Sequence, residues 1–316
     1  MNNDLPGSFN HVPVMLGECI DALGVDSRPD GVFIDCTAGG GGHSFEIARR
    51  LKGGRLISID RDPDAVRAVS DRLACFGSTV TVVHENFVNL PAVMRDLNIA
   101  RADGILMDLG VSSYQLDSAE RGFSYMKDAF LDMRMDRSTG ISAYDVINGY
   151  PEEDLARIFY EYGEERYASK IASLIADARS RKKIETTSEL SDIVCSAYPK
   201  GYKEGHPAKR VFQAVRIEVN GELDILQDSV RNAVNALNTG GVIAVITFHS
   251  LEDRIVKKTF AELAKGCTCP PDFPVCVCGK KPVIDLTNRK PVLPSMNEQE
   301  TNPRSKSAKL RSAIKI

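Results

Sequence analysis

Val32-Phe-Ile-Asp-Cys-Thr-Ala-Gly-Gly-Gly-Gly-His43 is the stretch of sequence that decides the fold of this chain. An apolar run ends in four consecutive glycines, and a helical pattern follows from Ser44. Glycine allows a sharp backbone turn and lets a ligand approach more closely than a Cβ atom would permit. The helix that follows presents backbone N–H groups without helical partners at its start. The stretch therefore predicts a strand, a ligand-binding turn and a helix.

A second apolar run, Arg55-Leu-Ile-Ser-Ile-Asp60, closes on a carboxylate about 20 residues after the glycines. That is the usual distance to the acid that binds ribose hydroxyls, so the two runs predict a βαβ unit for a nucleotide-type ligand. A dinucleotide fingerprint read from Gly40 would need a third glycine where Phe45 stands, which weighs against NAD. S-adenosylmethionine has no pyrophosphate, so a turn of small residues and a ribose-binding acid suffice for it.

Five apolar, β-branched runs alternate with helical patterns and predict an α/β fold with a doubly wound, mostly parallel sheet. The fourth and fifth runs are too far apart for one crossover helix, so we expect an inserted all-helical domain at 113–211. Residues 1–112 and 212–316 would then form the sheet domain. The five runs are Val32 to Ala38, Arg55 to Asp60, Val80 to Phe87, Asp103 to Val111, and Val242 to Phe248.

The insertion has clear helix signals. One helix is expected between Pro151 and Gly163, and another over 166–181. A third begins at Thr186, with Glu189 at capping-box spacing. A long helix from Phe212 to Leu226 is then expected to return the chain to the sheet.

Composition limits the function classes. The chain has 316 residues, 43% of them hydrophobic, and a net charge of -3, so RNA contacts would depend on local basic segments such as 179–183, 200–210 and 302–316. No signal-like segment or long apolar run occurs, so we expect a cytoplasmic protein without membrane contact. Eight cysteines in a chain of this length favour reduced thiols over a disulfide scaffold.

Polar residues at strand ends mark the predicted ligand edge. The fourth run ends at Asp108, and the third ends at Phe87, which we expect to lie near an adenine. In open α/β sheets, ligands bind at the carboxyl ends of the strands. The alternatives are that Asp108 caps the next helix and that Phe87 is a core residue.

A set of longer motifs extends over nearly the whole chain. The motifs are Asp108-Leu-Gly-Val-Ser-Ser-Tyr-Gln-Leu-Asp117, Arg121-Gly-Phe-Ser124, Leu131-Asp-Met-Arg-Met-Asp136, His206-Pro-Ala-Lys-Arg-Val-Phe-Gln-Ala-Val-Arg-Ile-Glu-Val-Asn220, Phe248-His-Ser-Leu-Glu-Asp-Arg254 and Asn302-Pro-Arg-Ser-Lys-Ser-Ala-Lys-Leu-Arg311. Together they closely resemble the bacterial ribosomal RNA small subunit methyltransferase H family. The resemblance implies a class I, Rossmann-like, S-adenosylmethionine-dependent enzyme. Its implied activity is methylation of the N4 amine of cytosine 1402 in the decoding region of 16S rRNA, within the small ribosomal subunit.

The resemblance also implies site residues. Asp108 is the expected catalytic residue, since a carboxylate can accept the N–H bonds of a poorly nucleophilic cytosine amine. By matching motifs, the implied cofactor contacts are Gly41, Gly42, His43, Asp60, Phe87, Asp108 and Gln115.

Three further residues are candidates on the substrate side: Arg134, Arg216 and His249. For the arginines the alternative is structural ion pairing, of Arg134 with Asp132 and Asp136 and of Arg216 with Glu218. For His249 it is a buried histidine satisfied by a backbone partner. The chain lacks the Asp/Asn-Pro-Pro-aromatic motif of many amine methyltransferases, so base stacking would fall to Phe123, Tyr125 or Tyr114.

Cys267, Cys269, Cys276 and Cys278 form two C-x-C pairs that suit one structural Zn²⁺, with four reduced thiols as the alternative. Two other functions stay open: a non-catalytic RNA-binding ribosome assembly factor, and a nicotinamide-dependent oxidoreductase. A homodimer is compatible with the sequence.

Overall fold

The structure is a computed structural model that describes residues 13–203, 205–267, 269–270, 273–275 and 277–316. The chain divides into two compact units. The sheet unit joins Met1–Gly110 to Leu223–Ile316, and the helical unit is Val111–Glu222. The helical unit thus starts two residues before the expected insertion at 113–211 and ends eleven residues after it.

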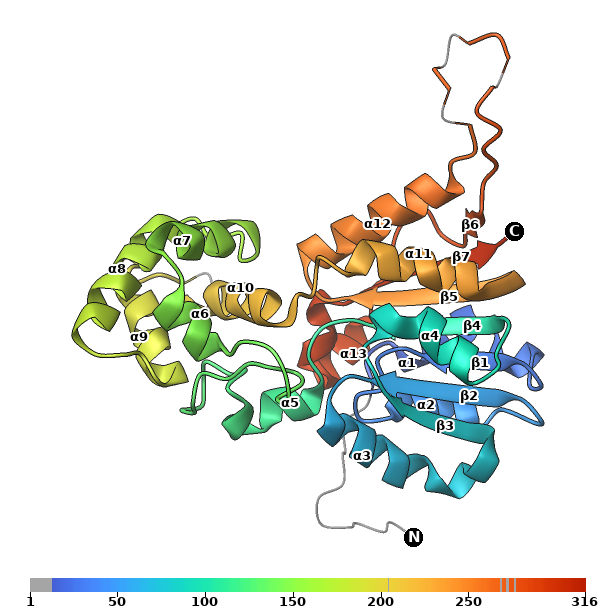
Figure 1. The fold of residues 1–316 in the computed structure, drawn as a ribbon, viewed down its shortest axis with the longest axis horizontal. Helices are drawn as coiled ribbons and strands as arrows, with labels where there is room; N and C mark the ends of the chain where they lie inside the picture. The colour runs from blue at the N-terminus through green and yellow to red at the C-terminus, as the bar shows by residue number, and fades with distance from the viewer. Residues whose placement is uncertain (1–12, 204, 268, 271–272, 276) are drawn as a thin grey trace. The chain divides into compact units, whose positions relative to one another are not determined.

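The sheet unit is built on one seven-stranded sheet with the order β3-β2-β1-β4-β5-β7-β6 (Figure 1). The first five strands are parallel, and β7 is antiparallel to both of its neighbours. The prediction of a mostly parallel, doubly wound sheet is confirmed. The strands are β1 Val32–Asp35, β2 Arg55–Asp60, β3 Val80–His84, β4 Ala102–Asp108, β5 Leu237–Thr247, β6 Ile284–Leu286 and β7 Lys309–Lys315.

Both faces of this sheet are buried, which explains why its strands read as continuous apolar runs. In β1, Phe33 and Ile34 pack into different hydrophobic clusters on opposite faces. The helices α4, α11 and α12 supply one cluster, and α1 and α2 supply the other. The helices of this unit are α1 Leu16–Leu23, α2 Gly42–Ala48, α3 Pro63–Leu73, α4 Leu90–Asp96, α11 Leu226–Ala236, α12 Ser250–Ala264 and α13 Met296–Thr301, with 3-10 turns at Val25–Ser27, Ala74–Thr79, Phe87–Asn89 and Pro303–Ser307.

The basic C-terminal segment is a strand rather than a free tail. In β7, Arg311 and Lys309 both contact the Asp253 carboxylate on α12, at 2.7 and 3.3 Å respectively. Lys315 donates to the carbonyl oxygens of Val234 and Asn235. These three cations were expected as phosphate-binding candidates, but they hold β7 to its neighbours.

The helices of the helical unit pack around a hydrophobic core of their own. The helix faces and the capping box that the sequence predicted for α7 and α9 are confirmed. Helix α7 buries Leu155, Ile158 and Phe159 as predicted, and α9 starts with the expected capping box between Thr186 and Glu189. The helices are α5 Ser113–Asp117, α6 Ala143–Gly149, α7 Glu152–Glu161, α8 Ala168–Arg181, α9 Thr187–Ser196 and α10 Ala208–Asn220, with a 3-10 turn at Ala119–Arg121.

The predicted long helix from Phe212 to Leu226 is wrong. Gly221 adopts a left-handed conformation with φ of 57° and caps α10, so the segment contains the end of one helix and only the start of the next. Phe212 and Val215 on α10 belong to the core of the helical unit. This explains why that unit extends to residue 222.

Helices with the length and apolar character needed to cross a bilayer do not occur in the described part of the chain.

Candidate active site

Three neighbouring strands end in an aspartate at the same edge of the sheet. Asp35 ends β1, Asp60 ends β2 and Asp108 ends β4, and β1 lies between the other two strands. Parallel strands bring their carboxyl ends to one edge, which is where α/β sheets bind ligands. The candidate site is therefore an acidic edge next to the glycine turn.

The glycine turn is held by Asp60. One oxygen of this carboxylate accepts the N–H of Gly39 at 2.7 Å, and the other accepts the N–H of Asp62 at 2.9 Å. Gly41 has φ of 74°, a left-handed conformation that favours glycine, and a Cβ on Gly42 would stand 2.2 Å from Pro13 Cγ. Burial raises the pKa of Asp60, although these two backbone hydrogen bonds lower it. The turn and the position of Asp60 at the end of a strand agree with the sequence prediction, and ribose binding by Asp60 stays a prediction.

His43 opens α2 and is buried. Its Nε2 lies 3.1 Å from the Val14 carbonyl oxygen, and because a carbonyl only accepts, Nε2 carries the proton. Burial lowers the pKa of His43 to about 4, although the Val14 bond opposes that shift. The neutral ring therefore presents an acceptor nitrogen, Nδ1, 3.7 Å from Asp108 Oδ2.

Asp108 has an unusual environment for a carboxylate. Its backbone N–H donates to Thr37 Oγ1 at 2.6 Å, which fixes the end of β4 against the segment after β1. Its Oδ1 is buried without a hydrogen-bond partner among the residues that the structure describes. Burial raises the pKa of Asp108 well above its ordinary value, and the charges of Asp35 and Glu252 raise it further. An acceptor oxygen is thus held at the ligand edge with unused hydrogen-bonding capacity.

Asp35 was not among the candidates from the sequence, although it belongs to the site. It is 1% exposed, and it accepts the Ser44 hydroxyl at 2.7 Å and the Thr37 N–H at 3.1 Å. Burial raises its pKa to about 6 against the effect of those two bonds, and the charge of Asp60 adds to the rise. Its position at a strand end, the same signal that marked Asp60 and Asp108, would have identified it.

Phe87 is half-buried at the first position of the 3-10 turn after β3, and it packs against a core cluster of the sheet unit. Asn86 caps this turn by accepting the Val88 N–H at 3.1 Å. The structure therefore places Phe87, which is only partly buried, after a strand that neighbours β2.

His249 is the N-cap of α12. Its Nδ1 accepts the Glu252 N–H at 3.5 Å, and its Nε2 lies 3.1 Å from Glu252 Oε1. The Glu252 carboxylate in turn accepts the Phe248 N–H at 2.8 Å. This arrangement is a capping box at the carboxyl end of β5. Contact between His249 and a nucleotide remains a prediction.

Within the helical unit, both candidate arginines are ion-paired. Arg134 binds Asp132 through Nε at 2.7 Å and Nη2 at 3.2 Å. Arg216 binds Glu222 through Nε and Nη2, both at 2.8 Å. The expected partner Glu218 instead accepts the Tyr150 hydroxyl at 2.8 Å, because residues two apart on a helix do not share a face.

Gln115 is buried in the first turn of α5, where it forms a capping box with Ser112. Its Oε1 accepts the Ser112 N–H at 3.0 Å. Of the aromatic candidates for base stacking, Phe123 is buried beneath Arg121, and Tyr125 stacks on His206 with ring centroids 4.4 Å apart. The structure gives each of these residues a local packing role.

Of the four cysteines that the sequence suggested for zinc, Cys267, Cys269 and Cys278 lie close together after α12. The fourth, Cys276, lies outside the described residues.

Sequence similarity to known proteins extends over almost all of this chain. The model of the MraW methylase family matches residues 8–316. The ribosomal RNA small subunit methyltransferase H of Clostridium botulinum (strain Loch Maree / Type A3) is 56% identical over 310 residues, which cover 98% of this chain and 99% of that protein. The protein of the same name from Symbiobacterium thermophilum is 54% identical over 312 residues, 98% of each chain.

Two solved structures show more distant similarity. TrmN from Thermus thermophilus has a TM-score of 0.43 at 12% identity, covering 96% of this chain and 48% of its own. An rRNA methylase from Streptococcus thermophilus has a TM-score of 0.39 at 9% identity and covers 92% of both chains. The family model and the full-length relatives together show that this chain belongs to the MraW methylase family.

Proposed function

We propose that this protein transfers a methyl group from S-adenosylmethionine to the N4 amine of cytosine 1402 in the decoding region of 16S rRNA. The substrate is the RNA within the small ribosomal subunit, so the enzyme works in the cytoplasm and takes part in ribosome biogenesis. Family membership supports a methylase, and the near relatives are named as enzymes of small-subunit ribosomal RNA.

The observation that carries the proposal is the row of Asp35, Asp60 and Asp108 at one sheet edge. The charge of Asp60 raises the pKa of Asp35, and the charge of Asp35 raises the pKa of Asp108. Binding of a cation at such a site is therefore electrostatically favourable. S-adenosylmethionine carries a sulfonium and an ammonium, whereas a nicotinamide dinucleotide carries an anionic pyrophosphate. The edge therefore favours the sulfonium donor over the dehydrogenase alternative.

The glycine turn fits the same group. The turn needs glycine at two positions, because Gly41 has a left-handed backbone and Gly42 packs closely against Pro13. Asp60 keeps lone pairs for ribose hydroxyls while it holds the turn. We assign His43 to the wall beside Asp108, and the half-buried Phe87 to the adenine. Gln115 completes the proposed set on the strength of the motif it shares with the family.

When bound, S-adenosylmethionine supplies an electrophilic methyl group. The chain must then orient the cytosine amine, whose lone pair is delocalised into the ring. Asp108 accepts one N–H bond of N4 through Oδ1, which favours a pyramidal nitrogen whose lone pair points out of the ring plane. The bound donor would supply its methyl carbon to N4 and keep its sulfur as a neutral thioether, and Asp108 would accept the proton that N4 loses. A carboxylate with a raised pKa is suited to take that proton at neutral pH.

Arg134, Arg216 and His249 are proposed as positioning residues on the substrate side. Each side chain contacts a carboxylate: Arg134 contacts Asp132, Arg216 contacts Glu222, and His249 contacts Glu252. Their side chains would therefore shape the surface that receives the RNA rather than take part in the chemistry.

The test is methyl transfer by purified protein to small subunits that lack this methyl group, with the modified nucleotide located by mass spectrometry of 16S RNA fragments. We expect one methyl on N4 of cytosine 1402. Asp108→Asn should lower kcat by about 10²- to 10³-fold while the affinity for S-adenosylmethionine changes by less than about tenfold. Asp71→Asn, on the exposed side of α3, is the matched control and should act like the parent.

Three outcomes would contradict the proposal. Binding to small subunits without transfer would favour the RNA-binding assembly factor. Transfer to another atom or nucleotide would refute the proposed specificity for N4 of cytosine 1402. An unaltered rate for Asp108→Asn would remove the proposed role of that carboxylate.

A further inference from the structure

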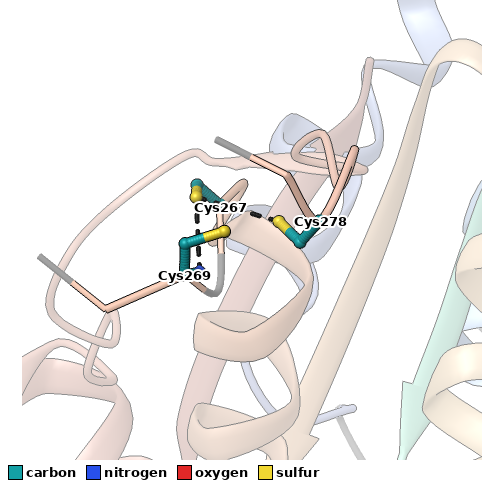
Figure 2. A group of neighbouring side chains, drawn as sticks. All are labelled: Cys267, Cys269 and Cys278. Carbon is teal, nitrogen blue, oxygen red and sulfur yellow. Dashed lines mark hydrogen bonds between the residues drawn. The ribbon is translucent and has the colours of Figure 1, made fainter. Parts of the chain in front are cut away.

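The segment between α12 and β6 gathers three cysteine thiols. The Sγ atoms of Cys267, Cys269 and Cys278 all lie within 4.8 Å of one another. Cys278 Sγ lies 3.8 Å from Cys267 Sγ, and the Cys269 N–H donates to Cys267 Sγ at 3.3 Å. Figure 2 shows the three side chains turned toward a common point from the two arms of the loop. A hydrogen bond between sulfur atoms thus connects Cys267 and Cys278, which are 11 residues apart in sequence.

The sulfur spacing matches a metal centre. A tetrahedral zinc ion with Zn–S bonds of about 2.3 Å holds its sulfur ligands roughly 3.8 Å apart. The Cys269 N–H points at a sulfur, which stabilises the thiolate form that a metal requires. A purely thiolate ligand set favours zinc over magnesium or calcium, which prefer oxygen ligands.

The loop has little else to define its shape. The described side chains of 265–282 join none of the hydrophobic clusters of the sheet unit. Phe273, Val275 and Val277 are 52%, 70% and 74% exposed. The two arms do meet at the base, where a Cβ on Gly266 would stand 2.9 Å from Pro282 Cδ. A segment that buries so little apolar surface needs a cross-link to hold one conformation.

We propose that Cys267, Cys269 and Cys278 bind a structural zinc ion that closes this loop. Cys276, which the sequence also suggested, lies outside the described residues. Helix α12 has its N-terminus at the active edge, and its C-terminus leads into the loop. Fifteen helical residues at about 1.5 Å each place the cysteines roughly 22 Å away from that edge. The zinc ion is therefore remote from methyl transfer.

The test uses the full chain, purified under reducing conditions from cells grown without added zinc. Elemental analysis should find about one zinc per chain, and cobalt exchanged into the site should give the absorption bands of tetrahedral thiolate coordination. Cys269→Ser and Cys278→Ser should each lower the zinc content at least tenfold. Cys75→Ser changes an exposed cysteine elsewhere and should retain the metal.

Limited proteolysis provides a second readout that does not depend on activity. Cleavage within 265–282 should become at least tenfold faster in the Cys269→Ser variant, while methyl transfer stays within about twofold of the parent. Zinc-free parent protein that takes up no cobalt would overturn the proposal, as would zinc retained in Cys269→Ser or a disulfide within the loop under reducing conditions.

Discussion

At the scale of single residues, the acidic edge stores unfavourable electrostatic energy that a cationic donor can relieve. Asp35 is the clearest case because it is almost completely buried and its pKa is about 6 instead of 3.8. The native protein therefore binds more protons than the unfolded chain between these two values, and stability falls as pH rises through that window. The cost is fully present at neutral pH.

Asp35→Asn tests this cost. Asparagine is close in shape and uncharged, so the free energy of unfolding without donor should rise by about 1–3 kcal/mol at pH 8 and change little at pH 4. Denaturant unfolding at both pH values measures the effect. Asp71→Asn on α3 should show no such difference. An equal effect of Asp35→Asn at the two pH values would mean that the Asp35 charge is not the cause.

Donor affinity should have the opposite dependence on pH. Ionised carboxylates attract the sulfonium, whereas the neutral sulfur of S-adenosylhomocysteine gains nothing from them. The ratio of the two affinities should therefore rise by about 3- to 10-fold between pH 5 and pH 8. Calorimetric titration measures it. A ratio that stays constant in the parent, or that rises as steeply in Asp35→Asn, would refute the electrostatic basis of donor selection.

Residues that follow a local pattern could be predicted from the sequence, whereas residues whose roles depend on distant partners could not. Asp60 and Asp108 could be found because each ends an apolar run. The pairing of Arg216 with Glu222 could not, because it depends on how the chain turns after Gly221. The capping role of His249 was open for the same reason: its partner Glu252 contacts it only once α12 has formed.

At the scale of elements, the glycine turn depends on close packing against the segment before α1. Gly42→Ala would place a Cβ 2.2 Å from Pro13 Cγ. We expect a loss of about 1–3 kcal/mol in the free energy of unfolding and a weaker affinity for S-adenosylmethionine. Thermal unfolding and calorimetric titration measure the two effects.

Gly17→Ala is the matched control, because the added Cβ on α1 meets nothing within 4 Å. Alanine is the better helix former, so this variant should be as stable as the parent or up to about 1 kcal/mol more stable. If both variants retained full stability, the turn would not be the close contact described above.

The attachment of β7 to α12 gives an independent prediction. The pKa of Asp253 is lowered, because its hydrogen bond to Arg311 and the charges of Arg311 and Lys309 outweigh the effect of burial. Its stabilising effect is therefore present above its ordinary pKa of 3.8 and is lost as pH falls below that value. Asp253→Asn should lower the free energy of unfolding by about 1–3 kcal/mol at pH 7 and by much less at pH 3, as measured by denaturant unfolding.

At the scale of the whole molecule, the chain divides into two units, each with its own hydrophobic core. The glycine turn and all three aspartates lie in the sheet unit. We expect S-adenosylmethionine to slow hydrogen–deuterium exchange in β1, α2 and β2, with little change in α7, α8 and α9. Mass spectrometry of peptides from the two units measures this. Strong protection of α7–α9 without protection of the glycine turn would place the donor elsewhere.

The sequence by itself determined the alternation of strands and helices, the glycine turn, the acids at two strand ends and the capping box of α9. These features are local, because hydrophobic period, glycine freedom and capping depend on residues only a few positions apart. Only the tertiary structure decided that α10 belongs to the helical unit, that β7 uses its cations to hold α12, and that burial and the charge of Asp60 raise the pKa of Asp35. Those outcomes depend on burial and on charges far apart in the chain, which no local pattern encodes.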